Sequence, residues 1–97
     1  MISIRWIDGG RHASAADEAR AIKAAEASLR AAGVTDHIAA EAAFDAAMER
    51  GDADPYAAGD SLAAAWEDAT IAANIAATKG WHDPNGGAVE LIAWERT

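Results

Sequence analysis

Alanine is the residue that most limits what this chain can fold into, because it supplies 29 of the 97 residues. It is the best helix former, and its short side chain lets helices approach one another closely. Only 21 apolar residues are larger than alanine. The sequence therefore predicts closely packed helices around a thin core that is held by a few bulky side chains.

Tryptophans are the largest of these side chains. We expect Trp6, Trp66 and Trp94 in the core, because they fall in predicted strands or helices. Trp81 and Tyr56 fall in predicted loops, where aromatic side chains suit contacts with a partner.

At the two ends of the chain, the residue pattern repeats with a period of two, so that successive side chains fall on opposite faces, which is typical of strands. The first alternation covers residues 2–7 and stops at Gly9 and Gly10, and the second covers residues 88–96. In the second, Val89, Leu91 and Ala93 share one face. The alternation leaves open whether the two strands run parallel or antiparallel.

The middle of the chain changes to a helical period. The first helix is predicted over 14–33, with Ser14 as its N-cap and Gly33 at its C-terminal end. The second is predicted over 35–51, with Thr35 as its N-cap and Gly51 as its stop. Its buried face is predicted to hold Ala40, Phe44, Ala47 and Met48.

A third helix is predicted over 61–79, after a short turn at 55–58. Apolar residues lie on two sides of it, so it should be the central helix. The order is then strand, three helices, strand: one α+β domain over 1–97, in which the terminal strands pair into a small two-stranded sheet. Such a sheet has open edges, so a homodimer through the sheet edge is a second expectation.

The net charge of −8 is confined to one part of the chain. Residues 36–68 hold nine acids and one base, whereas the remaining residues hold seven of each. The acids of this segment are Asp36, Glu41, Asp45, Glu49, Asp52, Asp54, Asp60, Glu67 and Asp68.

Three of these acids, Glu41, Asp45 and Glu49, are spaced four residues apart and would lie on one helix face. Their mutual repulsion costs a few tenths of a kcal/mol per pair. Burial of Phe44 and Met48, on the same helix, would point these three acids outward. Their rise of about 6 Å resembles the spacing of phosphates along nucleic acid, which predicts docking into a basic groove. The alternative is a solvated face that only keeps an alanine-rich helix soluble.

The sequence matches catalytic and metal-binding motifs only in part. Asp52, Asp54 and Asp60 have part of the spacing of an EF-hand calcium loop, but Ala57 and Ala63 replace its glycine and its closing glutamate. His12, His37 and His82 have no zinc-ligand spacing, and we interpret His37 as a hydrogen-bonded helix residue. Without cysteine, nucleophile elbow or phosphate loop, we expect no enzyme, no metal and no cofactor.

The net charge limits the class of partner, and targeting signals limit the location of the protein. A strongly acidic chain is repelled by nucleic acid and by anionic membranes, so we expect a basic protein partner. The absence of cysteine, of a signal peptide and of a long apolar run favours the cytoplasm.

In size, acidity and compactness, though in no motif, the chain resembles small phage-encoded inhibitors of host defence such as anti-CRISPR or anti-restriction proteins, several of which imitate DNA charge. The resemblance implies an acidic binding protein that blocks a basic, nucleic-acid-binding protein surface through the acids of residues 36–68 and Tyr56. The alternative is a small oligomeric structural or interaction module with a merely solubilising acidic face.

Overall fold

The computed structural model describes residues 2–7, 14–51, 61–78 and 88–94. Its elements are β1 (Ile2–Trp6), α1 (Ala15–Ala31), α2 (His37–Glu49), α3 (Ser61–Thr78) and β2 (Val89–Ala93). This order confirms the predicted β-α-α-α-β layout of an α+β fold. The predicted turn at 55–58 lies outside the described residues.

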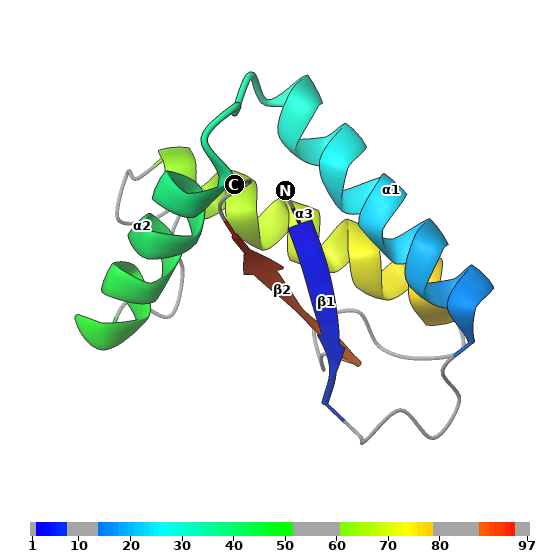
Figure 1. The fold of residues 1–97 in the computed structure, drawn as a ribbon. Helices are drawn as coiled ribbons and strands as arrows, with labels where there is room; N and C mark the ends of the chain where they lie inside the picture. Colours follow the sequence, from blue (N-terminus) through cyan, green and yellow to red (C-terminus); the bar gives the residue numbers. More distant parts are fainter. Residues whose placement is uncertain (1, 8–13, 52–60, 79–87, 95–97) are drawn as a thin grey trace.

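The two terminal strands pair with each other in antiparallel orientation, with Ile2 opposite Ala93 and Trp6 opposite Val89. Figure 1 shows the sheet lying across α3, with α1 along one side and α2 on the other. Ile2, Val89 and Leu91 are buried in the core. The pairing direction, which the sequence left open, is therefore antiparallel, and one face of the sheet covers the helices.

Helix α3 is the central element, because it contacts α1, α2 and β2. Four consecutive residues of its second turn, Ala63 to Trp66, are buried, so neighbours surround it on several sides. Alanines make this close packing work: Ala21 and Ala25 of α1 and Ala69 and Ala73 of α3 are all fully buried. The prediction of a central third helix is confirmed.

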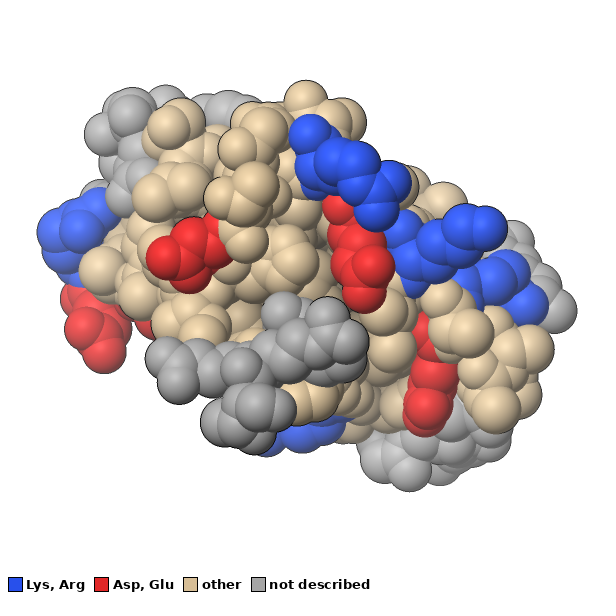
Figure 2. Space-filling model, turned by 45° about the horizontal axis from the view of Figure 1, so that its top comes forward, with Lys and Arg blue, Asp and Glu red and all other residues tan. Residues whose placement is uncertain are grey.

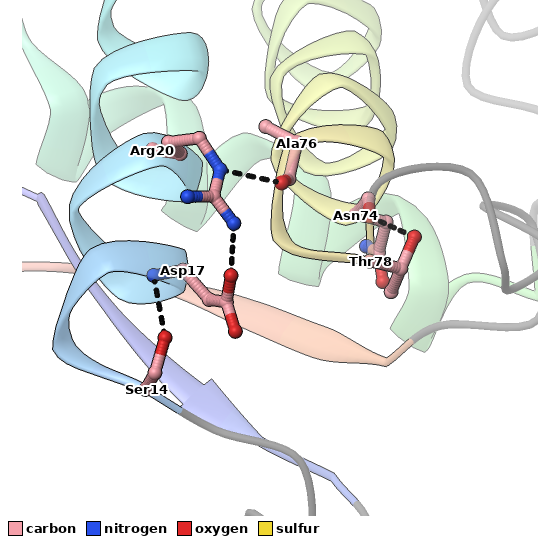
Figure 3. A network of polar contacts seen from close by, with 6 residues as sticks. All are labelled: Ser14, Asp17, Arg20, Asn74, Ala76 and Thr78. Carbon is pink, nitrogen blue, oxygen red and sulfur yellow. Dashed lines mark hydrogen bonds and ion pairs between the residues drawn. The ribbon is translucent and has the colours of Figure 1, made fainter.

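The first turn of α1 is stabilised by an N-cap and by a contact with α3. The Ser14 hydroxyl accepts a hydrogen bond from the Asp17 N–H at 3.1 Å, as predicted for the N-cap. Arg20 forms an ion pair with Asp17, and its Nε donates to the Ala76 carbonyl of α3 at 3.4 Å (Figure 3). The start of α1 is thereby tied to the last turn of α3.

Both predicted glycine stops are confirmed, but the N-cap of α2 is not Thr35. Gly33 and Gly51 have φ angles of +77° and +81°, the left-handed conformation that glycine adopts without steric cost. The N-cap of α2 is Asp36, whose Oδ1 accepts from the Ala39 N–H at 3.0 Å. Both residue types can cap, and the carboxylate adds a favourable interaction with the positive end of the helix dipole.

Two predicted core residues, Trp94 and Met48, are exposed. Trp66 is 3% exposed and Trp6 packs half-buried against the core, but Trp94 is 46% exposed. Trp94 follows β2 on the alternate face, away from the helices, so its position in the period-two pattern outweighs its size. Met48 is 41% exposed, because α2 presents only a narrow stripe through Ala40 and Ala47 to the core. Trp81 lies outside the described residues.

Candidate protein-binding surface

The described part of the acidic segment keeps its excess of negative charge. Residues 36–51 and 61–68 hold six acids and one base, whereas the other described residues hold four of each. Asp36, Asp45, Glu49 and Asp68 are exposed, while Glu41 and Glu67 are half-buried. Four further predicted site residues lie outside the described residues: Asp52, Asp54, Tyr56 and Asp60.

Glu41 does not belong to a uniform outward stripe. Its Oε2 accepts a hydrogen bond from the backbone N–H of Ala93 in β2 at 2.8 Å. Asp45 and Glu49, one and two turns further along α2, are exposed. The structure thus divides the three stacked acids into one that contacts the sheet and two that face solvent.

The outer edge of β2, the edge away from β1, explains the role of Glu41. The Ile7 N–H donates to the Ala88 carbonyl at 2.9 Å, which fixes the alternation of the antiparallel ladder. Glu90 and Ile92 then direct their backbone groups toward β1. Val89, Leu91 and Ala93 direct theirs to the outer edge, in agreement with the bond from Ala93 to Glu41.

Asn74 of α3 occupies the first of these outer positions. Its Oδ1 accepts from the N–H groups of Ala88 and of Val89, the latter at 2.9 Å. Its Nδ2 donates to the carbonyls of Thr70 at 2.8 Å and of Val89 at 3.2 Å. All four hydrogen bonds that an amide side chain can make are present on a fully buried residue. The Asn74 side chain therefore stands in for a neighbouring strand at Val89.

Asn74 was not predicted from the sequence. The available signal was a single asparagine among the apolar residues of a helix interior, where asparagine is unfavourable unless its side chain has a specific partner. Such a residue on the face that packs against a strand is a candidate for closing the strand edge.

A groove of about 270 Å³ lies between α2 and the outer edge of β2. We call it the α2–β2 groove. Two of its lining residues are aromatic, Phe44 and Trp66, and three are acidic, Glu41, Asp45 and Glu90. The lining residues are Arg5, Glu41, Phe44, Asp45, Trp66, Thr70, Glu90, Leu91 and Ile92.

A second hollow, of about 260 Å³, lies where α1 leads into α2 and is lined by Glu26, Arg30, Val34, Thr35 and His37. The Nδ1 of His37 is buried and has no hydrogen-bond partner. The interpretation of His37 as a hydrogen-bonded residue is therefore wrong for this atom.

 

In the described part of the chain, no three histidine or carboxylate side chains lie close enough together to hold a metal ion. The acids Asp52, Asp54 and Asp60, which have part of the calcium-loop spacing, lie outside that part. No helix among the described residues is long and apolar enough to cross a membrane.

The face shown in Figure 2 carries charges of both signs. Basic side chains gather over α1, which holds Arg20, Lys23 and Arg30, and the acidic side chains stand apart from one another. Among the described residues, this face therefore presents no continuous acidic row. The exposed acids that could act together are those of α2 and the first half of α3.

Comparison with protein-family models, with curated proteins and with solved structures finds no match to this chain.

Proposed function

We propose that this chain is a non-enzymatic acidic binding protein that blocks a basic, nucleic-acid-binding surface of another protein. The observation that carries the proposal is the separation of charge. Residues 36–51 and 61–68 hold six acids and one base, and the other described residues are balanced. An excess of one sign in one part of a small protein steers that part toward a surface of the opposite sign.

The geometry of α2 supports the same function. Asp45 and Glu49 are exposed and lie about 6 Å apart along the helix axis, a spacing of the order found between phosphates of one strand. Asp36 adds an exposed carboxylate at the start of the helix, and Asp68 adds one on α3. These groups can neutralise lysines and arginines that would otherwise bind nucleic acid. Small phage-encoded inhibitors of the anti-CRISPR or anti-restriction type, which the chain resembles in size and acidity, illustrate this class of function.

A second candidate function is a small oligomeric interaction module, and one observation favours it. Ile7 is 59% exposed and Trp94 is 46% exposed, and the alternation of the strands places both on the sheet face away from the helices. Exposed apolar side chains on one face suit a contact with a second copy. Closure of the outer edge of β2 by Asn74 and Glu41 leaves β1 as the edge for strand pairing.

The experiment that tests the proposal is a pull-down from lysate of the native host. It uses the wild-type chain and two double variants that each remove two negative charges: Asp45→Asn with Glu49→Gln, and Glu18→Gln with Glu26→Gln. We expect the first variant to lose a basic partner that the second retains. Capture should fall between about 0.1 M and about 1 M salt, because the screening length shortens from about 10 Å to about 3 Å. Equal capture by both variants at both salt concentrations would contradict the proposal.

A further inference from the structure

We propose that the α2–β2 groove is a receptor for one cationic side chain, an arginine, of the basic partner. This inference rests on the proposed function and names the chemistry by which one part of the acidic surface recognises that partner. Three observations support it: the charge of the groove, the open position on the edge of β2, and the size and aromatic lining residues of the groove.

The charge of the groove favours a cation. Three carboxylates line it, those of Glu41, Asp45 and Glu90, against the single guanidinium of Arg5. Arg5 already forms an ion pair with Glu90, which lies directly opposite it in the sheet. One oxygen of Glu41 accepts the hydrogen bond from the Ala93 N–H, but a carboxylate has about four acceptor sites, so Glu41 retains capacity for another donor. Asp45 is exposed at the rim.

The edge of β2 supplies an acceptor at the centre of the groove. Asn74 bonds the outer backbone groups of Val89, and Glu41 bonds the N–H of Ala93. Between them, the outward N–H of Leu91 donates no hydrogen bond to the described residues and its carbonyl accepts none from them, although Leu91 is buried and lines the groove. A buried backbone group without a partner costs about 1–3 kcal/mol, so a ligand that bonds it gains affinity.

The same arrangement argues against an added strand as the occupant. A strand pairing with β2 would need the outer N–H groups of Val89 and Ala93, and the side chains of Asn74 and Glu41 already accept from both. Among the described residues, the groups of Leu91 remain open between these two positions. The occupant is therefore a side chain that reaches the Leu91 carbonyl from the solvent.

Size and shape identify that side chain as an arginine. The groove of about 270 Å³ is smaller than the pockets of about 300–1,000 Å³ that hold small molecules. Phe44 and Trp66 are among the lining residues, and aromatic rings attract a guanidinium held beside them. Its five N–H donors, held in a rigid fork, can reach the Leu91 carbonyl and a carboxylate together, which the single ammonium of lysine does less well.

The test is an NMR titration of the isotope-labelled chain with N-acetyl-arginine amide. Matched titrations use the corresponding citrulline derivative, which has the same length and no charge, and the lysine derivative. We expect saturable shifts of the Leu91 amide and of Trp66 with arginine, weaker binding of lysine and no binding of citrulline. Asp45→Asn should weaken arginine binding about tenfold, as expected for the loss of one charged hydrogen bond. Glu49→Gln, on the same helix but outside the groove, should leave it unchanged.

Two results would overturn the inference: no saturable shift at Leu91 and Trp66, or equal losses of binding in the Asp45 and Glu49 variants, which would indicate general charge attraction. The unliganded spectrum of each variant shows whether it is folded, so a loss of binding can be assigned to the groove. Failure here would leave the proposed function standing if the pull-down still showed charge-dependent capture. Failure of the pull-down with arginine binding intact would remove the proposed function and keep the groove.

Discussion

Replacement of Asn74 by aspartate tests how the sheet is held to the helices. Aspartate has nearly the same shape as asparagine, so the change creates no cavity. It replaces the Nδ2 donor by an oxygen that faces the carbonyls of Thr70 and Val89. The two hydrogen bonds are lost, and an acceptor is placed against two acceptors on a fully buried residue.

The magnitude follows from these contacts. Each lost hydrogen bond costs about 1 kcal/mol, and the buried Val89 carbonyl without its donor adds about 1–3 kcal/mol. A loss of about 3 kcal/mol or more is therefore expected. Since small domains have free energies of unfolding of about 5–15 kcal/mol, this is between about a fifth and about three fifths of the total.

The measurement is urea unfolding followed by circular dichroism, with linear extrapolation to water. The control is Thr78→Val, at an equally buried position of α3, where the hydroxyl donates only to the Asn74 carbonyl at 2.7 Å. That carbonyl keeps its bond within the helix, so a loss below about 1 kcal/mol is expected. If Asn74→Asp were no more destabilising than Thr78→Val, the idea that Asn74 replaces a strand partner would be refuted.

Three further predictions concern single residues. Glu41→Ala should lower the free energy of unfolding by about 1 kcal/mol, because the Ala93 N–H loses its acceptor, whereas Glu41→Gln should preserve most of it; equal effects in urea unfolding would contradict this role. Gly33→Ala should cost about 1–2 kcal/mol in the same assay, because φ is +77° while the added Cβ meets no atom within 4 Å, and a neutral result would count against the left-handed stop. Ile7→Lys should leave the mass measured by light scattering unchanged; a wild-type dimer that this variant dissociates would favour the oligomeric module.

The order of elements could be predicted because each boundary has a local cause. Ser14, Gly33 and Gly51 act through hydrogen bonds and backbone angles within a few residues, and the structure shows all three in the expected roles. The N-cap of α2 was misplaced by one residue, since Thr35 and Asp36 are both competent and local sequence does not choose between them.

Long-range contacts could not be predicted in the same way. The bonds of Asn74 to Val89 and of Glu41 to Ala93 join residues that are 15 and 52 positions apart. The stacked acids of α2 were expected to act together, but the position of β2 beside the helix draws Glu41 into the fold. The exposure of Trp94 likewise depends on which face of the sheet meets the helices, and not on the residue type.

The most direct test of the central claim is competition between this chain and nucleic acid for the captured partner. Fluorescence anisotropy of a labelled duplex bound to that partner would be followed as the chain is added. The wild type and the Glu18→Gln, Glu26→Gln variant should release the duplex, and the Asp45→Asn, Glu49→Gln variant should release it only at higher concentration. Simultaneous binding of the duplex and the chain to the partner would contradict the claim that the exposed acids of residues 36–51 and 61–68 block a nucleic-acid-binding surface.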